Sequence, residues 1–183
     1  MAAGRPWLLR KPEAARIGTA YPSGGKPMLQ RGFTLVELLI TVAILGVLLS
    51  LAVPSFQGTI ARNNVASAAS VLSTSLSLAR SEAVKRGASV TVCKSSNGST
   101  CVTSGDWSQG WIMFVTAGTP LRVYEAPSGG VSLGVGPNQI VFSATGFANA
   151  AATFDACKSG VNRRTIQLSA SGRVRVAEGS QCS

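Results

Sequence analysis

The fold of this chain is decided by one stretch, Arg31-Gly32-Phe33-Thr34-Leu35-Val36-Glu37, and by the apolar run that follows it as far as Pro54. Between Phe33 and Val53, Glu37 is the single charged side chain. An apolar run of about 20 residues is long enough to cross a bilayer as a helix. A carboxylate near the start of such a run is costly in lipid, so its presence indicates a function.

The motif Gly-Phe-Thr-Leu-Val-Glu in front of an apolar helix resembles the N-terminal signal of type IV pilins and type II secretion pseudopilins. The resemblance implies that a prepilin peptidase cuts between Gly32 and Phe33 and methylates the new N-terminus. It also implies that Glu37 pairs with the N-terminal amine of a neighbouring subunit, which offsets the cost of burying both charges. An ordinary signal anchor is the alternative. A secretory signal peptide fits less well, because its apolar region is shorter.

Residues 1–32 are expected to be absent from the working protein. They contain four prolines and a Ser23-Gly24-Gly25 run, a composition typical of disorder. Translation from Met28 would give a short leader of five residues and make 1–27 a gene-model extension; a genuine long leader is the alternative. The predicted organisation is a leader (1–32), a transmembrane and assembly helix (33–54) and a periplasmic globular domain (55–183).

Composition argues against catalysis. The chain has 17 Lys and Arg against 7 Asp and Glu, a net charge of +10, and removal of residues 1–32 would reduce this to +5. There is no histidine, so the commonest general base and metal ligand is missing. The acidic residues are scattered, with no pair at a spacing that suggests acid–base chemistry. We therefore expect no enzymatic activity, no cofactor and no metal.

Four cysteines follow the apolar run, Cys93, Cys101, Cys157 and Cys182. An even number on the periplasmic side predicts disulfides, and three pairings are possible. Cys93 with Cys101 would close a short loop around the turn-forming residues 95–99, and Cys157 with Cys182 would then tie down the C-terminus. A zinc site would need closer clustering of the cysteines.

Hydrophobic periodicity predicts one helix over 33–86, followed by strands. Apolar residues recur at helical spacing from Val65 to Ala83, and Gly87 suits the position just after a helix. Short segments with strand character, separated by Gly, Ser and Pro, follow at 88–94, 110–116, 121–126, 139–143, 164–170 and 173–177. The predicted fold is α+β and type IV pilin-like: a long N-terminal transmembrane α-helix packed on an antiparallel β-sheet C-terminal domain.

The segments 79–87 and 90–93, followed by Trp107 and Gly110-Trp111, resemble the GspH/FimT family of minor pilins. The resemblance implies a single-pass inner-membrane protein with a periplasmic C-terminal domain, which is assembled into a pilus or pseudopilus. The implied partners are prepilin peptidase, other major and minor pilins or pseudopilins, and inner-membrane lipid.

The C-terminal segment is basic and suggests a ligand. It contains Lys158, Arg163, Arg164, Arg173 and Arg175, with Glu178 as its one acid. On an extended strand, Arg173 and Arg175 project from one face about 6–7 Å apart, so two guanidinium groups could bind neighbouring phosphates of DNA. A Cys157–Cys182 bridge would hold the segment in place and reduce the entropy lost on binding.

Gly172-Arg173-Val174-Arg175 also resembles the Gly-Arg-x-Arg element of FimT-like proteins, which implies DNA binding in natural transformation. Similar C-terminal sequences occur in FimU-like minor pilins, where the role is structural. Three functions therefore stay open at this point: a competence pilin that binds DNA, a structural minor pilin at the filament tip that primes assembly, and a GspH-like pseudopilin of type II secretion.

Overall fold

The computed structural model describes residues 32–115 and 118–182, apart from the side chains of 51–55; the predicted leader therefore lies, except for Gly32, outside the described residues. The chain divides after Val42 into two compact units, and the described strands all belong to the second, Ala43–Ser183. One helix, α1, runs over Leu35–Arg86, two residues shorter at its start than predicted. Its backbone stays helical through Pro54.

Gly87 ends α1 as the sequence predicts. It adopts φ 61°, a left-handed conformation that glycine reaches without strain. The Gly87 N–H donates to the Val84 carbonyl and the Ala88 N–H to the Ala83 carbonyl, both at 3.3 Å. These two bonds form a Schellman motif, which satisfies carbonyl groups that the helix end would leave unpaired.

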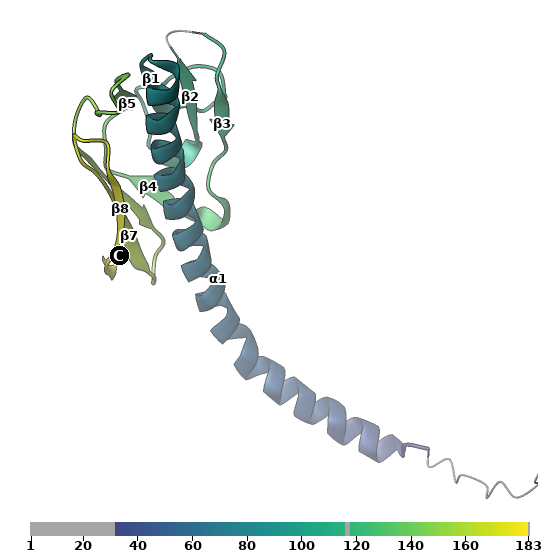
Figure 1. Ribbon diagram of the computed structural model, residues 1–183. Coiled ribbons are helices and arrows are strands. Elements are labelled where there is room, and N and C mark those ends of the chain that lie inside the picture. The colour runs from purple at the N-terminus through teal and green to yellow at the C-terminus, as the bar shows by residue number, and fades with distance from the viewer. Residues whose placement is uncertain (1–31, 116–117, 183) are drawn as a thin grey trace, which may run out of the picture. The chain divides into compact units, whose positions relative to one another are not determined.

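The strands form two antiparallel four-stranded sheets (Figure 1). In the first sheet the order is β3 (Arg122–Tyr124), β2 (Trp111–Val115), β1 (Val90–Lys94), β5 (Gln139–Phe142). In the second sheet the order is β4 (Ser132–Gly134), β6 (Ala152–Cys157), β7 (Asn162–Leu168), β8 (Val174–Gln181). Short 3₁₀ turns lie at Trp107–Gln109 and Ser128–Gly130.

One hydrophobic core joins the second half of α1 to both sheets. The predicted stripe of the helix is at most 1% exposed at Val65, Ala69, Leu72, Leu76, Ala79 and Ala83. It shares this core with residues of both sheets, among them Ile140 and Phe142 of the first and Phe154 and Ile166 of the second. Burying a leucine of this kind contributes roughly 1.5–3 kcal/mol, so the stripe attaches the helix firmly to the sheets. The α+β pilin-like fold is confirmed.

Two tryptophans, each 1% exposed, complete the core. Trp107 packs edge-on against Phe154, with ring centroids 5.1 Å apart, and Trp111 stacks on Tyr124 at 5.4 Å. The buried indole N–H of Trp111 donates to Ser75 Oγ at 3.0 Å, and that of Trp107 donates to the Pro137 carbonyl at 3.0 Å. Both polar groups are therefore satisfied inside the core.

The structure contains the two disulfides that the sequence favours, Cys93–Cys101 and Cys157–Cys182, with Cα atoms 5.6 and 5.8 Å apart. The first closes a loop over the end of β1. The same loop is held by Lys94, which is 5% exposed and whose Nζ donates to the carbonyls of Thr103 at 3.2 Å and Gly105 at 2.7 Å. A covalent bond and a buried ammonium group on adjacent residues therefore fix this loop to the sheet.

Candidate functional site

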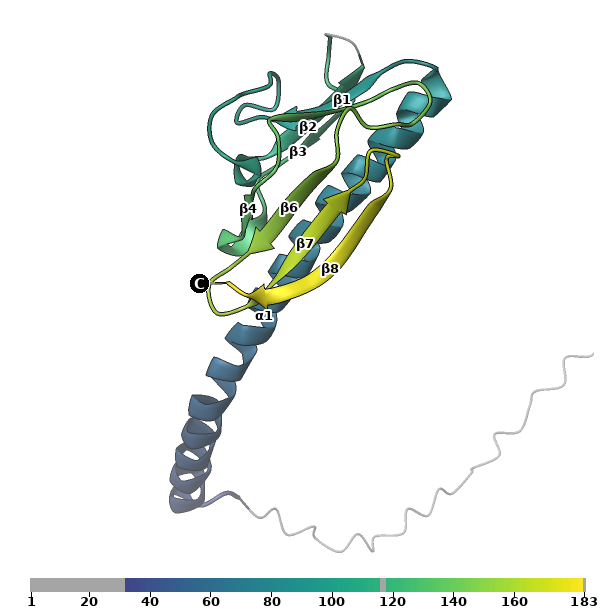
Figure 2. The same ribbon diagram turned by 90° about the vertical axis from the view of Figure 1, so that its left-hand side faces the viewer.

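The basic C-terminal segment forms a hairpin of β7 and β8. Figure 2 shows the two strands side by side, with their connecting turn next to α1. Hydrogen bonds among Ser169, Gly172 and Arg173 close the turn. Ser169 N–H donates to the Arg173 carbonyl at 3.0 Å, Gly172 N–H to the Ser169 carbonyl at 2.9 Å, and Arg173 N–H to Ser169 Oγ at 3.1 Å. Arg173 is thus the last residue of the turn, and Arg175 lies on β8 opposite Gln167.

Three of the five basic candidates have partners inside the domain. Arg163 forms an ion pair with Asp155 at 3.2 Å, and Arg164 forms one with Glu178 at 3.2 Å. Lys158 Nζ donates to the Gly129 carbonyl at 2.6 Å. Each of the three side chains is half-buried. Contacts within the domain fix the positions of these three side chains, and the ion pairs largely neutralise the charges of Arg163 and Arg164.

Arg173 and Arg175 differ from those three residues. Both are exposed, and within residues 32–115 and 118–182 neither takes part in an ion pair. Between them Val174 packs against the core, so the two guanidinium groups lie on the outer face of the strand. They line one open hollow of about 460 Å³ together with Gln167, Leu168, Ser169 and Ser171. This arrangement presents two adjacent cations among hydrogen-bonding side chains and backbone.

Gly172 fixes where the arginine pair lies. It has φ 77°, and a Cβ at this position would collide with the Gly146 carbonyl oxygen and approach Arg80 Nε to 3.0 Å. Arg80 Nε in turn donates to that carbonyl at 3.1 Å. The turn at 169–173 is therefore held against a second turn and against α1. This is why a glycine precedes the two arginines.

The Cys157–Cys182 bridge acts at the opposite end of the hairpin. Cys182 follows β8 and its N–H donates to the Val161 carbonyl at 2.9 Å, beside the start of β7. The bridge closes the sheet at that end. The contacts of Gly172 with Gly146 and Arg80 lie nearer to the arginine pair and restrain it more directly.

The predicted processing and assembly residues lie where α1 begins. Gly32, Phe33 and Thr34 precede the helix, and Glu37 is in its first turn. Thr34 Oγ1 accepts a hydrogen bond from the Glu37 N–H at 3.2 Å, which makes Thr34 the N-cap. The carboxylate of Glu37 is exposed near the positive end of the helix dipole.

The start of α1 exposes its apolar side chains. From Phe33 to Leu49 the large apolar side chains are between 53% and 81% exposed. A continuous apolar surface of this kind marks a site that lipid or another protein covers. Within the part of the chain that the structure describes, no helix is long and apolar enough to cross a membrane.

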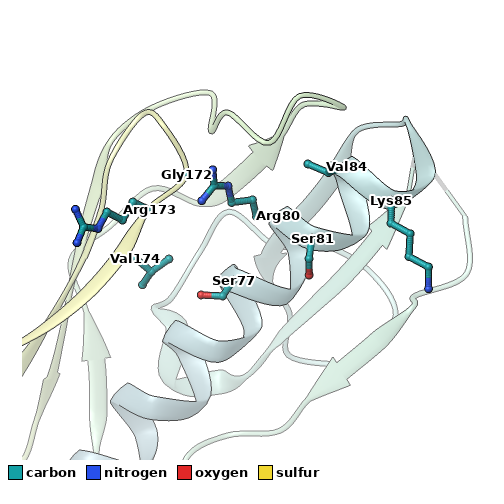
Figure 3. A pocket seen from close by; sticks show the side chains of 8 residues that line it. All are labelled: Ser77, Arg80, Ser81, Val84, Lys85, Gly172, Arg173 and Val174. Atoms are coloured by element: carbon teal, nitrogen blue, oxygen red, sulfur yellow. The ribbon is translucent and has the colours of Figure 1, made fainter.

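The sequence reasoning misses two basic residues beside the hairpin, Arg80 and Lys85. Arg80 is an exposed residue of the helix, and Lys85 is one of the two basic residues in its last turn. The structure brings both to the same surface as Arg173 (Figure 3). The sequence holds no local signal for this, because nearly 90 residues separate the two segments.

These features, a long N-terminal helix on antiparallel sheets with a methylation-type motif ahead of it, define a subunit of the type IV pilin class. Residues 68–172 match the family model described as "Type II transport protein GspH". The match covers more than half of the chain, which therefore belongs to the GspH family, among the GspH/FimT-like minor pilins. Residues 27–53 match the "Prokaryotic N-terminal methylation motif", a range that includes Gly32, Phe33 and Glu37.

Curated relatives match a short part of this chain. The type IV major fimbrial protein FimA of Dichelobacter nodosus is 57% identical over 37 residues, 20% of this chain and 24% of that protein. A fimbrial protein of Pseudomonas aeruginosa is 45% identical over 58 residues, 32% of this chain and 37% of that protein. The chain thus spans about a quarter to a third of the length of these relatives.

Among solved structures, the type IV minor pilin FimU of Pseudomonas aeruginosa is similar to this chain, with a TM-score of 0.55 and 24% identity. The match covers 67% of this chain and 97% of that chain. At this level of identity the likeness shows the shared fold alone.

Proposed function

We propose that this minor pilin binds DNA through Arg173 and Arg175 and so serves DNA uptake from a pilus. The observation that carries the proposal is the contrast within one hairpin: Arg163 and Arg164 are paired with acids, whereas Arg173 and Arg175 are exposed and unpaired in the described part of the chain. Arginines on adjacent outward positions, about 6–7 Å apart, match the spacing of phosphates along one strand.

The recognition would be electrostatic and largely independent of base sequence. Phosphate contacts by Lys and Arg release counterions, so the affinity falls with salt by a slope of about 0.9 per contact for duplex DNA and 0.7 for a single strand. Arg173 ends a rigid turn, in which Gly172 is packed on Gly146 and Arg80, and Arg175 follows on β8. Little backbone entropy is therefore lost when the two arginines bind.

The test compares the full-length chain in mild detergent with an Arg173→Ala/Arg175→Ala variant. Affinity for short duplex and single-stranded DNA would be measured at several salt concentrations. An Arg62→Ala/Arg122→Ala variant is the matched control, because it removes two exposed arginines that lie outside the hairpin. Residues 1–32 carry six basic residues, so the difference between variants is the informative quantity.

We expect the hairpin variant to bind more weakly and with a salt slope smaller by about 1.4 to 1.8, the sum of two phosphate contacts. The control variant would keep the slope of the unaltered chain. Equal binding by all three proteins, or no binding by the unaltered chain at low salt, would remove the arginine pair from the function.

Anchoring and assembly form the second part of the proposal. In this proposal, prepilin peptidase cuts after Gly32 and methylates Phe33. Helix α1 then anchors the subunit in the inner membrane, with its C-terminal domain in the periplasm. From there the subunit joins other pilins or pseudopilins. The methylation-motif match and the exposed apolar side chains from Phe33 to Leu49 support it. Mass spectrometry of the N-terminus tests the processing step: a chain that still begins ahead of Phe33 in the filament would contradict it.

A purely structural role is the competing function, either priming at the tip of a pilus or service in a type II secretion pseudopilus. The family match to a type II transport protein favours this alternative. A strain that lacks the protein distinguishes the three functions. Loss of DNA uptake with normal filaments supports DNA binding, loss of filaments supports priming of a pilus, and loss of exported protein supports type II secretion.

A further inference from the structure

A groove runs between the last turns of α1 and the β7–β8 hairpin. Its walls are Ser77, Arg80, Ser81, Val84 and Lys85 on the helix and Gly172, Arg173 and Val174 on the hairpin, and its volume is about 610 Å³. Figure 3 shows Arg80 between Arg173 and Lys85, with Ser77 facing Val174. Three cations therefore line the groove, and none of its lining residues is acidic.

The acidic residue nearest in sequence to the groove residues of α1 is Glu82, and it is already paired with Arg86. Glu82 accepts a hydrogen bond from Arg86 Nε at 2.7 Å, and that bond holds the pKa of Glu82 below its ordinary value. The carboxylate stays charged and paired with Arg86, and neither residue lines the groove. The positive potential of Arg80, Lys85 and Arg173 is thus not cancelled by a lining side chain.

Arg173 connects this groove to the hollow that contains Arg175. It lines both, so the basic side chains form one track in the order Lys85, Arg80, Arg173, Arg175. Lys85 and Arg80 are five residues apart on the helix, roughly 7.5 Å along its axis and about 140° around it, so they reach the groove from different sides of the helix. The two arginines on the hairpin are about 6–7 Å apart. The track therefore offers a series of cations to a polyanionic ligand.

We propose that the groove is a second phosphate-binding segment, in which Lys85 and Arg80 bind the backbone of the same nucleic-acid strand that Arg173 and Arg175 hold. This inference rests on the proposed DNA binding and extends it from the hairpin to the helix. The strand passes along the outside of the turn at Gly172, which is packed inward on the Gly146 carbonyl and Arg80. The site is therefore made of two elements that are remote in sequence.

Lys85 is the residue that tests the inference. Arg80 also supports the turn through the Gly146 carbonyl, so its loss would disturb the fold as well as the charge. Lys85 is exposed, and alanine in its place keeps a good helix former. The matched control is Arg62→Ala, which removes one exposed charge from the same helix roughly 35 Å away along its axis.

The experiment measures DNA affinity against salt for the full-length chain and for three variants: Lys85→Ala, Arg62→Ala and Arg173→Ala/Arg175→Ala. We expect Lys85→Ala to lower the salt slope by about 0.9 on duplex and 0.7 on single-stranded DNA, and Arg62→Ala to leave it unchanged. If Lys85→Ala behaves like Arg62→Ala while the arginine pair still matters, the groove is not a phosphate site and the proposed function stands. If the arginine pair has no effect, both proposals fall.

Discussion

Gly172 occupies a position where both the backbone and the surroundings exclude a side chain. Its φ of 77° strains any L-residue by roughly 1–2 kcal/mol, and a Cβ would meet the Gly146 carbonyl. We predict that Gly172→Ala lowers the free energy of unfolding by about 3 kcal/mol and also weakens DNA binding, because the turn that carries Arg173 must move. Urea unfolding followed by circular dichroism measures the first effect.

Gly160 supplies the control for this substitution. It has φ 79°, nearly the same as Gly172, but no atom lies within 4 Å of the place where a Cβ would stand. Gly160→Ala should therefore show the backbone cost alone and leave DNA affinity unchanged. Equal losses of stability in the two variants would mean that the contact with Gly146 and Arg80 does not restrain the turn.

Single residues also show what the sequence can and cannot predict about the site. Arg173 and Arg175 are identified from their alternation with Val174 and Val176, a pattern that a strand makes directly. The same reasoning does not separate them from Arg163, Arg164 and Lys158, because the partners of these three, Asp155, Glu178 and Gly129, come from other parts of the sheet and its loops. Side-chain pairing of this kind depends on strand register, which the sequence does not display.

At the level of the elements, the two disulfides should contribute unequally to stability. In the chain-entropy account, a bridge stabilises by restricting the unfolded chain, and the effect grows with the length of the loop. The separations are 25 residues for Cys157–Cys182 and 8 for Cys93–Cys101, which correspond to about 3.5 and about 2.5 kcal/mol. Paired Cys→Ser variants, compared by urea unfolding, measure the difference.

DNA binding gives the disulfide variants a second readout. Because Cys182 lies at the far end of β8 from Arg173, loss of the Cys157–Cys182 bridge should reduce stability more than affinity. A large loss of affinity in a variant that is still folded would show that the bridge, rather than the turn at Gly172, positions the arginine pair.

The elements can be predicted well where the apolar pattern is long and poorly where it is short. The helix is placed to within two residues, since its stripe extends over about five turns and ends at Gly87. Strands β4 and β6 are missed. The first has three residues, and the second contains two alanines beside Phe154, which lack the β-branched or aromatic character that favours a strand. These two segments become strands because they form hydrogen bonds with neighbouring strands of the second sheet.

At the scale of the whole molecule, we propose that Glu37 links the subunit to its filament. We predict that Glu37→Gln leaves the start of α1 intact, because the cap is made by the Glu37 backbone N–H and Thr34 Oγ1, but prevents incorporation into filaments for want of a carboxylate to pair with a neighbour's amine. Immunoblots of sheared filaments against the membrane fraction measure incorporation.

Thr34→Ala is the complementary change. It removes the cap, at a cost of about 1 kcal/mol to the helix, and keeps the carboxylate. This variant should still be incorporated. If it fails while Glu37→Gln is incorporated normally, the helix start rather than the charge is what assembly requires.

The buried ammonium group of Lys94 gives this lysine a different chemistry from Lys85. Acylation of a lysine needs an open line of approach to its amine, and Lys94 Nζ is instead held as a donor by the carbonyls of Thr103 and Gly105 beneath the Cys93–Cys101 loop. The folded loop therefore shields Lys94 from modification, while Lys85 on the groove is exposed and open to it.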